Sequence, residues 1–268
     1  MKQRQRLGLR ASWWIRGAAA MLGLGGLLAS AVQAPSAVGA ADPPADASPM
    51  DEPLRLLAEA NSSFANVTDY TCTLIKKESI NGVMMDQVMD MSVRNDPFSV
   101  YLRWLGPRDK VGQEACYVAG RNDGKMRVKS SGLIGVVGFV SIEPTDPRAM
   151  KTSRHAITEA GIGNLLQRLS TRWEIERKLN VTQVKIGEYE YNKRRCVRVE
   201  TTHTANPDNQ FFCYRAVIYF DKETHLPIRA EAYDWPTTPG DAKGTPMETA
   251  SYTNLQLNVG LPDDTFNK

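Results

Sequence analysis

The sequence predicts an α+β fold, in which one strongly curved antiparallel sheet, an incomplete β-barrel, is wrapped around one or two helices. Two long stretches of the chain consist of short runs that alternate apolar and polar residues, and turn residues such as Asn81-Gly82 separate these runs. An amphipathic helical pattern precedes each stretch. Runs of antiparallel strands with segregated helices indicate α+β, and a sheet of about ten strands usually curls or closes.

The first helix is predicted to begin near Pro53, because Pro is favoured at the first helical position. Asp51 and Glu52 lie where the helix dipole favours negative charge. Apolar residues then recur at helical spacing from Leu54 to Phe64, as expected for an amphipathic helix. Five strands joined by tight turns follow at residues 70–79, 83–94, 98–105, 112–119 and 125–129.

The third of these strands shows the clearest alternation, because Phe98, Val100, Leu102 and Trp104 share one face. The segment 132–142 is different, since it is apolar on all sides and has Gly at every third position. It has two interpretations. One is a mobile apolar flap over a cavity, because glycine permits backbone rearrangement. The other, which we favour from the sequence, is a single buried strand whose glycines allow close packing.

A second helix is predicted at residues 158–178, with Thr158 as its cap and Glu159 favouring its start. One apolar stripe along it comprises Ile162, Leu165, Leu166, Leu169 and Trp173. The second set of strands is predicted at residues 181–189, 195–202, 211–221, 227–234 and 248–257.

The first 40 residues are predicted to be a secretory signal peptide. They contain no acidic residue, an apolar run at 17–32 and small residues before Ala34 and Ala40, and cleavage after Ala40 is preferred. These features are typical of export signals. An uncleaved N-terminal anchor is the alternative. No Cys lies near the site, so lipid attachment through an N-terminal Cys is not expected. The five basic residues of this segment are Lys2, Arg4, Arg6, Arg10 and Arg16.

Residues 41–52 are predicted to be a disordered linker rich in Pro, Ala and Asp, and residues 53–268 a single domain. The whole chain carries 33 Lys and Arg against 30 Asp and Glu, a net charge of +3. Without the first 40 residues, 28 basic and 30 acidic residues remain, a net charge of −2. Nucleic-acid binding needs a basic patch on the folded domain, so it is not expected here. The protein is expected to be a monomer.

Common catalytic motifs are absent from the sequence. It has no G-x-S-x-G, S-x-x-K or H-E-x-x-H, which are the patterns of serine hydrolases and zinc proteases. His155, His203 and His225 each stand alone in their segments. We therefore predict a protein that is not an enzyme and has no metal site and no cofactor.

The four cysteines are Cys72, Cys116, Cys196 and Cys213. An even number in an exported protein permits disulfides. The predicted pair is Cys196 with Cys213, because this pairing places Val197 opposite Phe212 and aligns the apolar faces of two strands. Cys72 and Cys116 then form the remaining pair, and four free buried thiols are the alternative.

Residues 220–229 contain Asp221-x-x-Thr224-x-x-Pro227 between two predicted strands, and residues 252–266 end in Pro-Asp-x-x-Phe. These two stretches resemble the periplasmic outer-membrane lipoprotein carrier and its relatives. This resemblance implies a curved, incomplete β-barrel around helices and a location outside the cytoplasm. In that superfamily, a regulator of an anti-sigma factor uses the same fold to sense mislocalised lipoproteins. No ligand-contact residue of the carrier transfers to this chain position by position.

Within this superfamily the chain is most similar to an uncharacterised family of secreted bacterial proteins, domain of unknown function 1571. Residues 69–78, 97–107 and 154–164 carry the similarity, which extends over about 55–266. The family has no assigned activity, so the resemblance implies a fold and a compartment but no mechanism.

The leading hypothesis is an exported binding protein that holds a lipophilic ligand or lipoprotein acyl chain in an apolar concave face. The first alternative is an envelope interaction or sensor module with a filled core and a protein partner. The second is a secreted hydrolase of unrecognised type, for which His155 is the first residue to test. The candidate lining residues of the apolar face are Phe98, Val100, Leu102, Trp104, Leu165, Leu169, Trp173, Phe212, Tyr214 and Ile218.

Overall fold

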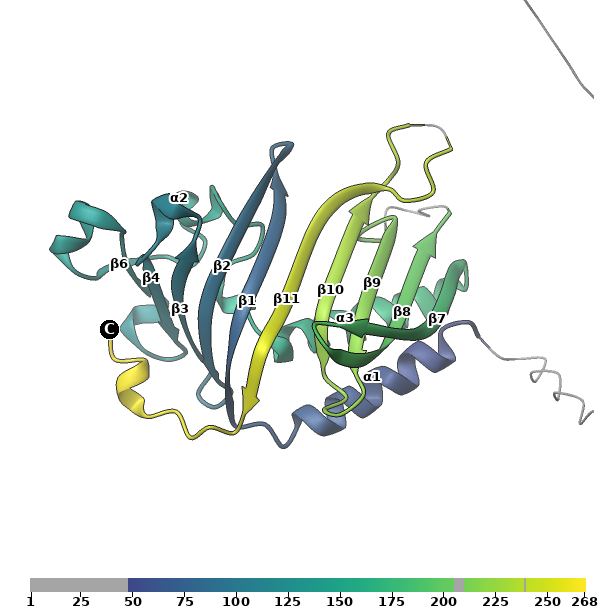
Figure 1. The fold of residues 1–268 in the computed structure, drawn as a ribbon, viewed down its shortest axis with the longest axis horizontal. Helices are drawn as coiled ribbons and strands as arrows, with labels where there is room; N and C mark the ends of the chain where they lie inside the picture. The colour runs from purple at the N-terminus through teal and green to yellow at the C-terminus, as the bar shows by residue number, and fades with distance from the viewer. Residues whose placement is uncertain (1–47, 205–209, 239) are drawn as a thin grey trace, which may run out of the picture. The chain divides into compact units, whose positions relative to one another are not determined.

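A computed structural model describes residues 48–204, 210–238 and 240–268. The predicted signal peptide and most of the predicted linker therefore lie outside the described residues. Eleven strands form one antiparallel sheet in the order β6-β5-β4-β3-β2-β1-β11-β10-β9-β8-β7. The sheet is open, with β6 and β7 at its edges, and it bends around the helices (Figure 1). The predicted α+β class with a curved antiparallel sheet is confirmed.

The first half of the sheet follows the chain order. Its strands are β1 (Asp69–Ile80), β2 (Val83–Arg94), β3 (Ser99–Gly106), β4 (Glu114–Val118), β5 (Met126–Lys129) and β6 (Val140–Ile142). Asn81 and Gly82, both with positive φ, form the predicted tight turn between β1 and β2. The Asn-Gly turn matches the twist of the two strands, and it sets a register that runs from Ile80 opposite Val83 to Asp69 opposite Arg94.

The second half runs back toward the first. Its strands are β7 (Thr182–Tyr191), β8 (Arg194–His203), β9 (Arg215–Asp221), β10 (Pro227–Asp234) and β11 (Thr245–Leu257). The last strand, β11, pairs with β1 and joins the two halves. The turn between β9 and β10 carries the Asp-x-x-Thr motif. There Asp221 accepts hydrogen bonds from the backbone N–H of Thr224 at 2.8 Å and from its hydroxyl at 3.0 Å, and Arg194 lies 2.5 Å from its carboxylate.

Two helices pack against the inner face of the sheet. α1 (Asp51–Phe64) begins two residues before its predicted start at Pro53. α3 (Ile162–Leu179) begins four residues after its own predicted start. The sequence placed the start of α3 at Thr158, but residues 157–159 form the short 3-10 helix η4, and Gly161 caps α3 instead. Only glycine fits there, because φ is +96° and a Cβ would lie 2.7 Å from the Tyr70 hydroxyl.

The main core lies between these helices and the inner face of the sheet. Leu57 and Ala60 of α1 belong to the same buried cluster as Leu166 and Trp173 of α3. Apolar residues of both sheet halves complete the cluster, so that α1, α3 and the sheet share one core. Among the described residues, no helix is long and apolar enough to cross a membrane.

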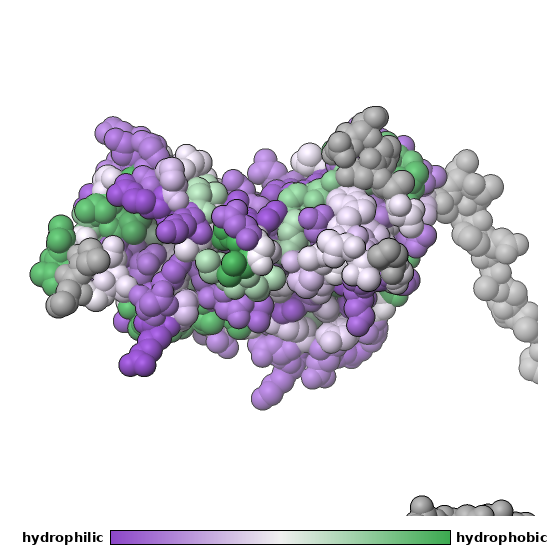
Figure 2. Space-filling model, turned by 90° about the horizontal axis from the view of Figure 1, so that it is seen from above, coloured by the Kyte–Doolittle hydropathy of each residue, from purple (hydrophilic) through white to green (hydrophobic). Residues whose placement is uncertain are grey.

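The segment 132–142 differs from the prediction of one buried strand. It forms the 3-10 helix η3 (Gly132–Val137) followed by the edge strand β6. Val136 and Val137 are 83% and 80% exposed. Figure 2 shows hydrophobic surface at the left of the molecule, which is the end where β6 lies in Figure 1. The prediction was wrong because continuous hydrophobicity does not distinguish a buried strand from an exposed apolar turn. The short helices η1 (Arg108–Lys110), η2 (Asn122–Gly124), α2 (Pro147–Met150) and η6 (Asp263–Thr265) complete the described elements.

The predicted disulfides are not formed, because all four cysteines are free and buried. Cys196 lies opposite Asp221 in the β8–β9 register, and β9 begins only at Arg215, so Cys213 precedes the strand. The prediction assumed that a strand begins at Phe211, which shifts the register. Burial raises the pKa of the Cys72 and Cys213 thiols to about 12, so both stay protonated and unreactive near neutral pH.

Candidate functional site

A cavity of about 460 Å³ lies on the inner face of the sheet, beneath α3 and the segment 144–161. Its volume is within the range of about 300–1,000 Å³ that is typical of small-molecule sites. Both halves of the sheet contribute to it. Its apolar part includes Leu74, Met89, Leu102, Trp104, Ile218 and Tyr252.

Small side chains on three neighbouring strands leave the space open. Ala230 of β10 lies between Ala250 of β11 and Ile218 of β9 in the sheet register. In the next inward-facing row Ala232 lies opposite Ala216. All four alanines line the cavity, and larger apolar residues at these positions would fill it.

Seven of the ten predicted lining residues are brought together at this cavity, and three are not. Val100 is fully buried in the core, and Phe98 packs against Tyr117 with ring centroids 6.2 Å apart. Tyr214 instead packs near Trp235, because the strand alternation assumed for it begins only at Arg215. The seven residues at the cavity are Leu102, Trp104, Leu165, Leu169, Trp173, Phe212 and Ile218.

One end of the cavity is polar. Glu78 of β1 lies directly opposite Glu248 of β11 in the register, and like charges in such a pair repel. Cations of the protein offset this repulsion. Lys76 Nζ lies 3.0 Å from Glu78 Oε2, and Arg154 Nε lies 3.2 Å from Glu248 Oε2.

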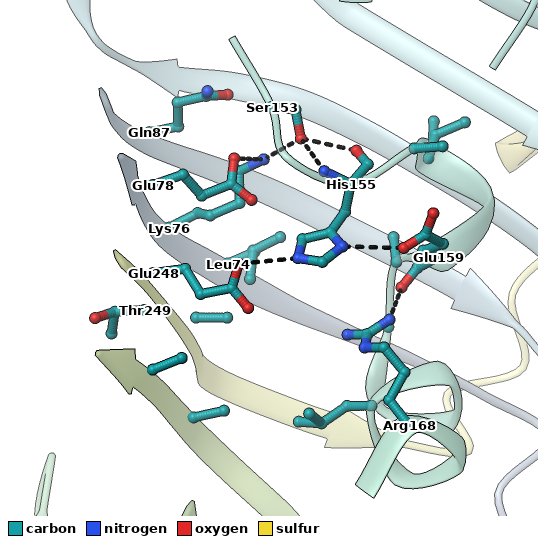
Figure 3. A pocket seen from close by; sticks show the side chains of 18 of the residues that line it. Leu74, Lys76, Glu78, Gln87, Ser153, His155, Glu159, Arg168, Glu248 and Thr249 are labelled. Carbon is teal, nitrogen blue, oxygen red and sulfur yellow. Dashed lines mark hydrogen bonds and ion pairs between the residues drawn. The ribbon is translucent and has the colours of Figure 1, made fainter. Parts of the chain in front are cut away.

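His155 lies between two carboxylates at the same end (Figure 3). Its Nδ1 is 2.9 Å from Glu159 Oε2, and its Nε2 is 2.9 Å from Glu248 Oε2. Ionised carboxylate oxygens only accept hydrogen bonds, so both contacts are satisfied together when the imidazole is protonated and both ring nitrogens donate. The hydrogen bond with Glu248 raises the pKa of His155 above its usual value, although burial opposes this. Burial alone would raise the pKa of Glu248, but His155 lowers it overall.

Removing this charged histidine should change the pH dependence of stability. A pKa raised in the folded state adds stability that is complete below the unfolded-state value of about 6.5 and is lost as pH rises through the folded-state value. We therefore expect the contribution of His155 to the free energy of unfolding to fall as pH rises above about 6.5. His155→Gln should lower the free energy of unfolding by about 1–2 kcal/mol at pH 6 and remove most of that fall.

Urea unfolding at several pH values measures both effects. His225→Asn is a matched control, since the exposed His225 side chain forms no ion pair with any described residue. A His155→Gln variant with the wild-type pH profile would contradict a charged histidine in this position.

The segment 152–155 is held over the cavity by side chains from several elements. Lys76 Nζ donates to the Ser153 hydroxyl at 2.9 Å, and Lys110 Nζ donates to the Thr152 hydroxyl at 2.8 Å. Gln87 Nε2 donates to the Thr152 carbonyl at 2.6 Å. No strand pairing includes these four residues. The segment is therefore held by side-chain hydrogen bonds and not by strand pairing.

The polar end contains residue types found in two kinds of catalytic site, a metal site and a serine–histidine pair, but its contacts fit neither. Donor atoms of Glu78, His155 and Glu248 lie within 4.8 Å of one another, as in a metal site, but Lys76 and Arg154 already neutralise the two carboxylates. Ser153 is near His155, but its hydroxyl donates to the His155 backbone carbonyl. Because both imidazole nitrogens face carboxylates, Ser153 and His155 do not form a nucleophile–base pair of the kind that hydrolases use.

Sequence reasoning missed the polar end and the alanines. Lys76 and Glu78 lie on the same face of β1 as Leu74, at alternate positions, and charged residues on an apolar face are a detectable signal. Glu248 and His155 lie far away in the sequence. The β1–β11 register brings Glu248 opposite Glu78, and the segment 152–155 brings His155 to Glu248.

Several solved structures are similar to this chain at low sequence identity. Lipoprotein LppX of Mycobacterium tuberculosis is 12% identical, with 78% of this chain and 98% of that chain covered and a TM-score of 0.44. A putative outer-membrane lipoprotein-sorting protein domain of Vibrio parahaemolyticus is 12% identical, with 80% and 95% covered and a TM-score of 0.38. The LolA superfamily protein NE2245 of Nitrosomonas europaea is 9% identical, with 80% and 97% covered and a TM-score of 0.34.

A search of curated proteins gave no match. The model of one family, described as protein of unknown function (DUF1571), matches residues 67–268, which include every strand of the sheet and the whole cavity. The family resemblance inferred from the sequence is thereby confirmed, and the chain belongs to the DUF1571 family.

Proposed function

We propose that this protein is an exported, non-enzymatic binding protein that holds a lipophilic ligand, such as an acyl chain, in the cavity under α3. The observation that carries the proposal is the row of alanines opposite α3. Ala230 and Ala250 line a space of about 460 Å³ whose walls also include Leu74, Met89 and Tyr252. A protein that needed only stability would gain by filling this space with larger apolar side chains.

The energetics favour a chain-like apolar ligand. Transfer of each methylene from water contributes about 0.8 kcal/mol, so about ten buried methylenes contribute roughly 8 kcal/mol before the costs of association. Such a ligand needs few specific polar contacts. The rest of the proposal rests on the sequence, because the basic and apolar N-terminal segment supports export to the periplasm or the extracellular space. We propose that the protein acts as a monomer.

The cavity favours carriage over the two alternatives. An interaction module with a filled core does not need a cavity lined by alanines. A hydrolase needs an activated nucleophile, and Ser153 and His155 do not form one.

Binding can be tested with the purified protein after removal of lipid by organic extraction. We expect a fluorescent fatty-acid probe to bind with micromolar affinity, and lipids extracted from the untreated protein to be detectable by mass spectrometry. Unlabelled fatty acid should displace the probe at one molar equivalent. Absence of both probe binding and copurified lipid would contradict the proposed function.

A further inference from the structure

Arg172 is a cation in the cavity wall that lacks an anionic partner. It lies on α3, is partly buried and lines the cavity. Its guanidinium stacks on the ring of Phe212 at 3.6 Å from the centroid. No hydrogen bond or ion pair joins Arg172 to any residue that the structure describes. Partial burial disfavours the charged form of this guanidinium and lowers the pKa of Arg172.

The nearby carboxylates already have other partners. Glu248 is bound by His155 and Arg154. Glu176, one turn after Arg172 on the helix, lies with its Oε2 3.2 Å from His203 Nε2, although neither atom forms a hydrogen bond. Both acids favour the charged form of Arg172, but no ion pair joins either of them to its guanidinium.

A second arginine adds to the positive charge on the same face of α3. Arg168 lies one turn before Arg172 and also lines the cavity. Its Nη1 donates to the Glu159 backbone carbonyl at 2.9 Å, which is a neutral acceptor. Like charges at i and i+4 destabilise a helix, so an anion bound beside Arg172 would relieve this repulsion.

We propose that Arg172 binds the oxyanion headgroup of an amphiphile, a carboxylate or a phosphate ester, whose apolar tail occupies the cavity. The inference rests on the proposed function and specifies its ligand class. The planar guanidinium presents paired N–H donors that match two oxygens of a carboxylate or phosphate. Phe212 holds the guanidinium plane from one side, while Leu169 and Trp173 beside Arg172 on α3 line the apolar space for the tail.

Displacement of an uncharged probe, N-phenyl-1-naphthylamine, tests this inference. The competitors are dodecanoate, dodecyl phosphate and 1-dodecanol, which share one chain length. In wild type, we expect at least one anion to displace the probe at a roughly tenfold lower concentration than the alcohol. The stronger of the two anions distinguishes a fatty-acid carboxylate from a phospholipid-like phosphate.

In Arg172→Met the preference for the anion should disappear while the affinity for 1-dodecanol stays within about twofold of wild type. Methionine keeps an unbranched side chain against Phe212, and retained alcohol binding shows that the variant is folded. Arg177→Met is the matched control, because Arg177 lies on the same helix, is exposed and does not line the cavity. It should keep the preference.

The outcomes separate the two proposals. If the alcohol displaces the probe as well as both anions in wild type, or if Arg172→Met keeps the preference, the headgroup inference is wrong while lipophile binding stands. If neither the probe nor any competitor binds, the proposed function fails and the headgroup inference fails with it.

Discussion

Replacing Ala250 by Phe is expected to lower the affinity for a lipophilic ligand roughly thirtyfold, because the ring occupies space that about two or three ligand methylenes would otherwise fill. Ala250 lies on β11 opposite Ala230 and lines the cavity beneath α3. The free energy of unfolding should stay the same or rise, since filling an existing cavity adds apolar contacts. Probe titration and urea unfolding of the same preparation measure both effects.

The two measurements together distinguish an open cavity from a filled core. In a filled core, the larger side chain would lower the free energy of unfolding by about 1–3 kcal/mol through overpacking. The wild-type protein would then bind no ligand in the first place. Thr253→Phe is the matched control, because Thr253 is on the same strand but faces away from the cavity, with its hydroxyl bonded to the Thr73 carbonyl. An Ala250→Phe variant that binds like wild type would contradict the assignment of the cavity.

Asp221→Ala is expected to have the largest effect on stability, a loss of about 3 kcal/mol in the free energy of unfolding. The Asp221 side chain is 1% exposed and lies 2.5 Å from Arg194 Nε. It also accepts from the backbone N–H groups of Glu223 and Thr224. Alanine would leave these donors and a partly buried guanidinium without their acceptor, at the turn that sets the β9–β10 register.

Urea unfolding near pH 7 measures the loss, and Glu223→Ala is its control. Glu223 also pairs with Arg194, but its side chain is 82% exposed, so its removal should change stability by no more than about 0.5 kcal/mol. Burial alone would raise the pKa of Asp221, but Arg194 and Thr224 lower it overall. The contribution of Asp221 is therefore present at neutral pH and lost as pH falls through this lowered pKa. Equal effects of the two variants would contradict the assigned role of Asp221.

Local sequence signals were enough for most of the fold. The Asn81-Gly82 turn and the alternation from Phe98 to Trp104 depend only on residues within one or two strands, so the first half of the sheet could be predicted closely. The start of β9 could not be predicted, although its end at Asp221 was. Phe211 to Tyr214 alternate like a strand, but Phe211 stacks on His203 with centroids 4.0 Å apart, and pairing with β8 begins only near Arg215.

The candidate site was predictable in its apolar part only. Leu165, Leu169 and Trp173 follow helical periodicity, so their common face could be inferred from the sequence. The segment 152–155 has no periodic pattern, and its contacts come from side chains on β1, β2 and η1. Such a segment is positioned by tertiary polar contacts, which single-sequence patterns do not encode. Recognising that Arg172 has no ion-pair partner likewise requires the positions of all neighbouring acidic side chains.

The uneven polarity of the cavity restricts the orientation of an amphiphile within it. The charged row of Glu78 and Glu248 is followed along the strands by a mixed row, in which Lys76 lies opposite Ala250, and then by the apolar row of Leu74 and Tyr252. An amphiphile bound as proposed lies with its headgroup toward the charged row and its tail toward Leu74 and Tyr252. The reverse orientation would place the headgroup among apolar side chains, which is costly.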